Sequence, residues 1–154
     1  MNGEMAGRAE VADGPIMLVE DNQDDVDLTV RALRKCGISN EIWVARDGVE
    51  ALEMLHLEGE SASSPPSLPV VVLLDLQMPR VDGFEVLRKL RASERYRFLP
   101  VVVLTSSAED RDKAEAYSLG ANSYVQKAID SEAFLEAVGQ LGLYWLGVNQ
   151  AKSP

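Results

Sequence analysis

The sequence predicts an α/β fold, in which a doubly wound, five-stranded parallel sheet carries helices on both faces. Short apolar runs occur five times along the 154 residues, and each precedes a segment whose apolar residues recur at helical spacing. One of these runs, 70–74, is continuously apolar, which is typical of a strand buried on both faces. The alternation uses nearly the whole chain, so we expect one folded domain.

The turn and helix-stop residues set the limits of these elements. A helix is expected after each strand; the first ends at Gly37 and the fourth at Gly120, because glycine readily adopts the conformation that ends a helix. The connection 59–69 is rich in Ser and Pro and is interpreted as a mobile surface loop. His56 is placed in the second helix, away from any metal-ligand spacing. The predicted strands are Ile16–Val19, Ile42–Ala45, Val70–Leu74, Val101–Leu104 and Ser123–Val125.

Composition narrows the class of partner. The 15 Lys and Arg residues against 25 Asp and Glu give a net charge of −10, which repels DNA and anionic lipid surfaces. No stretch approaches the roughly 20 apolar residues of a membrane span, and the N-terminus lacks the apolar run of a secretory signal. The single cysteine, Cys36, cannot form an internal disulfide. We therefore expect a cytoplasmic protein that binds neither nucleic acid nor membrane.

Polar side chains follow four of the five predicted strands. Ligands of an open α/β sheet bind beyond the carboxyl ends of the strands, so these side chains are candidates for one site. Clustered carboxylates repel one another, and Mg²⁺, which prefers oxygen ligands, would relieve that repulsion. An ionised Asp could then act as a nucleophile toward a phosphoryl group stabilised by an amine and a hydroxyl. The candidates are Glu20, Asp21, Asp75, Thr105, Ser106, Ser107 and Lys127.

Four motifs at these strand ends resemble those of response-regulator receiver domains. They are Leu-Val-Glu-Asp-Asn at 18–22, Leu-Leu-Asp-Leu-Gln-Met-Pro at 73–79, Val-Leu-Thr at 103–105 and Tyr-Val-Gln-Lys at 124–127. The resemblance implies the flavodoxin-like receiver fold with strand order 2-1-3-4-5. We expect the domain to span residues 15–143, followed by a C-terminal extension over 144–154. The mixture of Gly, Ala and charge in residues 1–14 indicates a disordered tail.

The resemblance assigns a role to each matching residue. Asp75 is the expected phosphoacceptor, and Lys127 and Thr105 stabilise its phosphoryl group. Thr105 and Tyr124 form the expected switch pair, while Gln77 and Ser107 are expected to tune dephosphorylation. The expected Mg²⁺ ligands are the carboxylates of Asp21 and Asp75, the backbone carbonyl of Gln77 and, through a water, Glu20.

The residue after Lys127 departs from the family pattern. Receivers usually have proline there, commonly after a cis peptide bond, whereas this chain has Ala128. A cis bond before alanine costs about 2.5–4 kcal/mol, against about 0.5–1 before proline. Both a trans, displaced loop and a strained cis bond remain open, and with them the direction of Lys127.

The C-terminus indicates how the signal leaves the domain. Residues 141–148 continue apolar and aromatic beyond the expected last helix, which either closes the core or forms a dimerisation arm of Tyr144, Trp145 and Leu146. This tail, with Asn-Ser-Tyr-Val at 122–125, resembles receivers that serve bacterial phytochromes. A homodimer and a sensor histidine kinase of that kind are the expected partners.

Two other functions remain open. An aspartyl-phosphate-forming hydrolase or phosphatase is one, although phosphatases of the haloacid-dehalogenase type carry a second Asp where this chain has Gln77. The other is a receiver-fold adaptor whose phosphorylation is silent. The preferred interpretation is a stand-alone response regulator that is not an enzyme, apart from catalysing its own phosphorylation and dephosphorylation.

Overall fold

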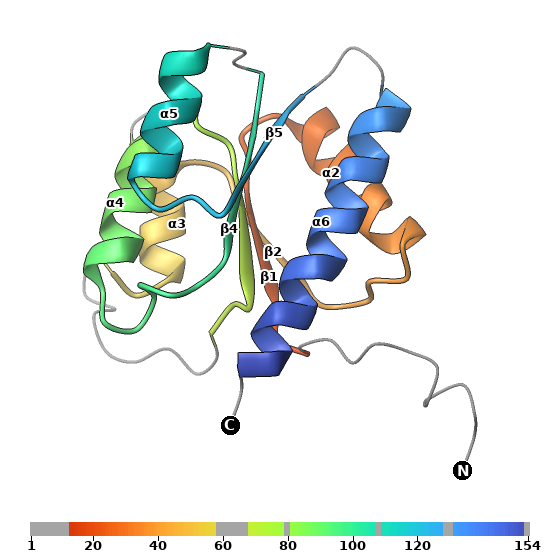
Figure 1. Ribbon diagram of the computed structural model, residues 1–154, viewed down its shortest axis with the longest axis horizontal. Helices are drawn as coiled ribbons and strands as arrows, with labels where there is room; N and C mark the ends of the chain where they lie inside the picture. The colour runs from red at the N-terminus through yellow and green to blue at the C-terminus, as the bar shows by residue number, and fades with distance from the viewer. Residues whose placement is uncertain (1–12, 58–67, 79–80, 107–108, 128–130, 153–154) are drawn as a thin grey trace.

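The computed structural model describes residues 13–57, 68–78, 81–106, 109–127 and 131–152, in which strands and helices alternate (Figure 1). The tail up to residue 12 and most of the predicted loop 59–69 lie outside this part of the chain. The strands are β1 (Ile16–Val19), β2 (Ile42–Ala45), β3 (Val71–Leu74), β4 (Val101–Thr105) and β5 (Ser123–Gln126). The helices are α2 (Gln23–Lys35), α3 (Gly48–Met54), α4 (Gly83–Ala92), α5 (Asp110–Ser118) and α6 (Ser131–Lys152).

All neighbouring strands are parallel, and their order is β2-β1-β3-β4-β5, which confirms the predicted topology. Strand boundaries differ from the prediction by one residue in β3, β4 and β5. In the register of β1 and β3, Val19 lies opposite Leu74. The residues that follow these two strands therefore emerge side by side.

The sheet separates two hydrophobic clusters, because successive side chains of a strand point to opposite faces. Figure 1 shows α3, α4 and α5 on one face and α2 and α6 on the other. Met17, Val19, Val72 and Leu74 belong to the first cluster. Their sequence neighbours belong to the second: Ile16, Leu18, Val71 and Leu73. Every residue of β1 and β3 is buried, as the continuous apolar runs predict.

Polar residues cap three helices at the edge of the sheet where the strands end. The side chains of Asn22, Asp47 and Asp82 each accept a hydrogen bond from the backbone N–H three residues later, which satisfies an otherwise unpaired helix donor. At the opposite ends, Gly37 and Gly120 have φ values of 82° and 103°, as expected for helix stops. The placement of His56 in a helix is wrong: α3 ends at Met54, and His56 follows with φ of 59°, the left-handed conformation that terminates the helix.

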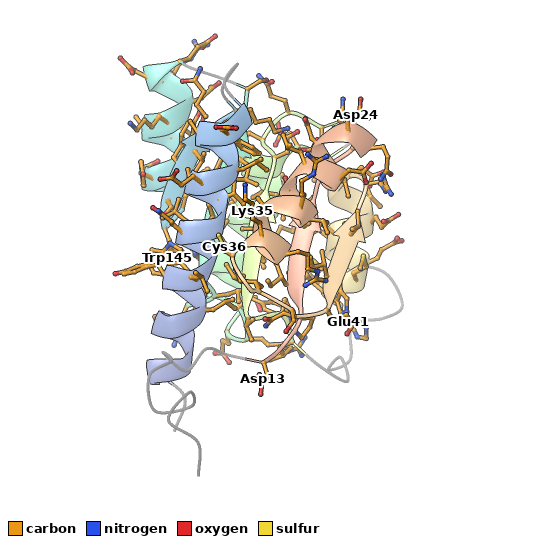
Figure 2. All side chains as sticks on the ribbon, turned by 90° about the vertical axis from the view of Figure 1, so that its right-hand side faces the viewer. Asp13, Asp24, Lys35, Cys36, Glu41 and Trp145 are labelled. Carbon is orange, nitrogen blue, oxygen red and sulfur yellow. The ribbon has the colours of Figure 1, made fainter. Side chains whose placement is uncertain are left out.

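The last helix is longer than the sequence pattern indicates. α6 continues without a break to Lys152, so the predicted boundary between residues 143 and 144 falls inside this helix. It packs closely on α2, where a side chain at Gly139 would collide with the Sγ of Cys36. Figure 2 shows Lys35 and Cys36 at the C-terminal end of α2, with α6 and its Trp145 alongside. Within the described residues, no helix combines the length and apolarity needed to cross a membrane.

Candidate functional site

The carboxyl ends of β1, β3, β4 and β5 bring the predicted site residues to one edge of the sheet. Glu20 and Asp21 follow β1, and Asp75 follows β3. One oxygen from each of these three carboxylates lies within 4.8 Å of the others. Thr105 ends β4 in a fully buried position, and its carbonyl oxygen accepts a hydrogen bond of 2.6 Å from the Lys127 N–H. The strand order therefore assembles residues that are far apart in the sequence.

Asp75 is held by its own loop and by its neighbours. Its backbone N–H donates to the Val19 carbonyl at 3.0 Å, which extends the β1–β3 pairing by one residue. Its Oδ1 accepts from the Gln77 N–H at 3.1 Å, and only 5% of the residue is exposed. The start of α4 packs on this loop, because Gly83 donates to the Leu76 carbonyl at 3.1 Å. Asp75 is thus a buried carboxylate with a fixed orientation.

Lys127 points into the acidic cluster. Its Nζ lies 2.6 Å from Glu20 Oε1, 2.8 Å from Asp25 Oδ2 and 3.5 Å from Asp75 Oδ2. Lys127 therefore faces Asp75, but Glu20 and Asp25 are nearer partners. The peptide bond from Lys127 to Ala128 lies outside the described residues, so the cis and trans alternatives for it both stand.

Asp25 is the site residue that the sequence analysis missed. It occupies the first turn of α2, and its N–H donates to the capping oxygen of Asn22 at 3.0 Å. The sequence does contain a signal for Asp25, because Asn22 is a strong N-cap residue. Asp25 therefore lies in the first turn of a helix that starts at the ligand-binding edge of the sheet. That position turns its carboxylate toward Lys127.

Gln77 and Tyr124, two of the remaining predicted residues, make contacts within the described part of the chain. The Gln77 side-chain oxygen accepts a hydrogen bond of 2.9 Å from the Ser106 hydroxyl, which ties the loops after β3 and β4 together. Tyr124 is half-buried on β5, and its ring centroid lies 6.4 Å from that of Tyr117 on α5. Ser107 lies outside the described residues.

Burial and charge shift the pKa values of three groups. Burial raises the pKa of Glu20 to about 7; the hydrogen bond from Lys127 opposes this, and the charge of Asp75 reinforces it. Burial also raises the pKa of Asp75, against the nearby Lys127 charge. Burial by itself would lower the pKa of Lys127, but hydrogen bonds to Asp25 and Glu20 outweigh it and the net pKa is raised. The raised pKa values of Glu20 and Asp75 show that the single positive charge of Lys127 does not fully stabilise their ionised forms.

This incomplete stabilisation of the carboxylates fits a bound divalent cation. Three carboxylates, those of Glu20, Asp25 and Asp75, contact the single ammonium group of Lys127. Asp21 adds a further carboxylate, and an oxygen of Asp21 lies within 4.8 Å of oxygens of Glu20 and Asp75. Hard cations such as Mg²⁺, Mn²⁺ and Ca²⁺ take oxygen ligands of this type. The arrangement can bind an ion and an anionic group next to it, with Asp75 and Lys127 facing that group.

The raised carboxyl pKa values predict how stability depends on pH. Glu20 has an ordinary value of 4.5, so between about pH 4.5 and 7 the folded state binds more protons than the unfolded state. The free energy of unfolding must then decrease as pH rises through that interval. For metal-free protein, we expect the ionisation of Glu20 to lower the free energy of unfolding by about 1–3 kcal/mol over that interval. Urea denaturation at several pH values would measure this decrease.

The Glu20→Gln variant provides the control, because it removes the titrating group. Its stability should change less than that of the wild type between these pH values. Addition of Mg²⁺ at pH 8 should raise the stability of the wild type, because the ion binds the ionised carboxylates of the folded state alone. An identical pH profile for both proteins would contradict the pKa assigned to Glu20.

Comparison with known proteins agrees with the fold. The response regulator receiver domain family matches residues 16–139, and the chain belongs to that family. Receiver domains act in two-component signalling and bind a divalent metal at an acidic pocket. The match favours this class over the phosphatase alternative and identifies a signalling protein rather than an enzyme acting on separate substrates.

Three proteins illustrate the similarity. The probable methanogenesis regulatory protein FilR2 of Methanothrix harundinacea is 44% identical over 139 residues, covering 90% of this chain and 88% of that protein. The crystal structure of the phosphorylated cyanobacterial phytochrome response regulator RcpA is 36% identical, with 87% and 94% coverage and a TM-score of 0.78. The Mn²⁺-bound response regulator Rcp1, from Synechocystis, is 35% identical, with 86% and 94% coverage and a TM-score of 0.76.

Proposed function

We propose that this chain is a response regulator that accepts a phosphoryl group on Asp75 from a sensor histidine kinase of the phytochrome type. The observation that carries the proposal is the placement of Asp75: a buried carboxylate within reach of both a candidate metal-ligand set and an ammonium group. The similarity to RcpA, a phytochrome response regulator, supports this kind of donor. A cytoplasmic location follows from such a donor and agrees with the single cysteine.

In the proposed reaction, one oxygen of Asp75 attacks the phosphorus atom of a phosphohistidine. The bond between phosphorus and the imidazole nitrogen breaks, and its electron pair leaves with the imidazole. The hydrogen bond from Gln77 N–H to Oδ1 orients the carboxylate so that the other oxygen faces the donor. Lys127 supplies positive charge to the transferred group. The protein therefore contributes mainly position and electrostatic stabilisation.

We assign Mg²⁺ to the acidic pocket. Asp21 and Asp75 would hold it through carboxylates, the Gln77 backbone carbonyl would be a further ligand, and Glu20 would act through a water. When bound, the ion supplies positive charge that neutralises both the carboxylates and the incoming phosphate. The convergence of the Glu20, Asp21 and Asp75 oxygens supports the site, and the Mn²⁺ bound to Rcp1 supports a divalent ion in a similar protein.

The proposed response to phosphorylation begins at Thr105. Its hydroxyl would be drawn toward the phosphoryl group, and Tyr124 would move inward behind it, changing the face formed by α5, β5 and α6. Tyr124 packs at the edge of the first hydrophobic cluster, which is a position from which it can move inward. Gln77 and Ser107 are proposed to set the phosphoryl lifetime through access of water. Signal output then occurs through protein contacts at that face.

Incubation with acetyl phosphate and Mg²⁺, followed by intact mass measurement, tests this function. One phosphoryl adduct per chain, lost when a chelator removes Mg²⁺, is the expected result. Turnover of acetyl phosphate with no retained adduct would support the hydrolase alternative. An absence of both would support an adaptor with silent phosphorylation.

We also propose a homodimer whose contact is centred on Tyr144 rather than on an arm of Tyr144, Trp145 and Leu146. Leu146 is fully buried in the chain's own core, and Trp145 donates from Nε1 to Ser123 Oγ at 2.8 Å, so neither forms a free arm. Tyr144 is 59% exposed and stacks edge-on against Trp145, with Leu143 38% exposed beside it. An exposed aromatic side chain of this kind is typical of an interface anchor.

Light scattering will measure this assembly. The wild type is expected to have the mass of two chains, and Tyr144→Ser is expected to weaken the dimer about tenfold or more, because an anchoring aromatic contributes about 2 kcal/mol. Tyr117→Ser is the matched control: it also removes an exposed tyrosine, 45% accessible, but from α5. A dimer unaffected by Tyr144→Ser would remove α6 from the interface.

A further inference from the structure

The ammonium group of Lys127 is shared unequally among its three carboxylates. Glu20 and Asp25 hold it at 2.6 and 2.8 Å, within the usual range of charge-assisted hydrogen bonds. Asp75 lies 3.5 Å away, at the limit of a hydrogen bond. The lysine that faces the phosphoacceptor is thus bound more closely by two other residues.

Of those two residues, Asp25 has the fewer other roles. Glu20 also belongs to the group of oxygens that converge on the metal position, and it accepts a hydrogen bond from the Asn22 N–H. Asp25 is not part of that converging group within the described residues. The charge of its carboxylate is directed at Lys127, and two-thirds of the side chain is shielded from solvent.

The helix holds Asp25 in this place. Asn22 caps α2 and fixes the backbone of Asp25, and the positive end of the helix dipole favours its ionised side chain. Lys127 is fixed separately, because its N–H is bonded to the carbonyl of Thr105 on β4. Two rigid elements therefore present the two charges to each other, which reduces the entropy cost of the ion pair.

We propose that Asp25 is a positioning residue that holds the Lys127 ammonium away from Asp75 until a phosphoryl group competes for it. The inference rests on the proposed function and assigns to α2 a part in it. A phosphoryl group brings about −1.5 to −2 charges to Asp75 and attracts Lys127 toward its oxygens. The Lys127–Asp25 pair stabilises only the unphosphorylated state, so it opposes the change that phosphorylation causes.

Beryllofluoride, a phosphoryl mimic that binds Asp carboxylates, gives a direct test. Its dissociation constant would be measured by ¹⁹F NMR at fixed Mg²⁺ in the wild type, Asp25→Asn, Asp25→Glu and Asp24→Asn. Asp24 is the matched control: it is an exposed carboxylate on the same turn, and Figure 2 shows it projecting from the N-terminal end of α2. Asp24→Asn removes the same charge without removing a partner of Lys127, so it reports the general electrostatic effect on anion binding.

Asp25→Asn is expected to bind beryllofluoride about three- to tenfold more tightly than Asp24→Asn, the range for loss of a partly shielded ion pair. Asp25→Glu, which keeps the charge, should stay within about twofold of the wild type. In a Lys127→Met background, Asp25→Asn and Asp24→Asn should have equal effects, because the partner of Asp25 is gone.

Equal affinities of Asp25→Asn and Asp24→Asn, or weaker binding by Asp25→Asn, would overturn the role of Asp25. A persistent Asp25→Asn effect in the Lys127→Met background would also overturn it, because the effect would not pass through Lys127. Failure of the wild type to bind beryllofluoride would be a different result: it would overturn the proposed function, and this inference with it.

Discussion

Asp75→Asn is expected to abolish the formation of a phosphoryl adduct from acetyl phosphate. The amide has no negative charge and is a far weaker nucleophile than the carboxylate. The substitution also replaces one of the three carboxylates that converge on the metal position with a neutral group. We expect the rate of phosphorylation, followed by intact mass, to fall at least about a hundredfold, as for removal of other nucleophiles.

Stability separates this loss of function from unfolding. Burial disfavours the ionised form of Asp75 and raises its pKa, so the neutral amide should leave the protein at least as stable as the wild type at pH 7. Asp24→Asn, which changes an exposed carboxylate, should be phosphorylated at nearly the wild-type rate. Retention of a stable adduct by Asp75→Asn would place the phosphoacceptor elsewhere in the chain.

Gly83→Ala is expected to lower the free energy of unfolding by about 2–3 kcal/mol, the cost of overpacking a rigid site. A methyl group at Gly83 would collide with the Asp75 carbonyl oxygen and would lie 2.7 Å from the Leu76 Cα. Both neighbours are backbone atoms of the loop that follows β3, so no side-chain rotation relieves the collision. The first turn of α4 must move away from this loop.

Gly147→Ala is the matched control for this variant. Gly147 also lies in a helix, but a methyl group there meets nothing within 4 Å. Alanine is preferred to glycine inside a helix by about 1 kcal/mol, so Gly147→Ala should be neutral or stabilising. Urea denaturation of both variants tests the difference. Equal stabilities would show that α4 does not need close contact with the Asp75 loop.

The fold could be predicted because each of its features has a local sequence signal. Continuous apolar runs mark buried strands, and glycine marks the ends of α2 and α5. The site could be predicted in outline for a related reason: polar residues that follow parallel strands must emerge at one edge. Glu20, Asp21, Asp75, Thr105 and Lys127 all lie at the ends of strands.

The predictions for the C-terminal aromatic residues and for His56 were wrong because they depend on tertiary neighbours that the local sequence does not specify. The aromatic residues after Leu143 are apolar enough for either a core or an interface, and only the path of α6 over the sheet shows that Leu146 is buried and Tyr144 exposed. His56 fits a helical apolar pattern, but α3 has already ended. Local patterns report burial on average and do not identify the neighbour that causes it.

By itself, therefore, the sequence determined the family, the strand order through its motifs, and the candidate residues for phosphoryl chemistry. The tertiary structure alone decided how one ammonium group is shared among carboxylates that come from β1, α2 and β3. The physical reason is that ion pairing depends on the distance between charged atoms, here 2.6, 2.8 and 3.5 Å. The fold sets these distances between groups up to 107 residues apart in the sequence.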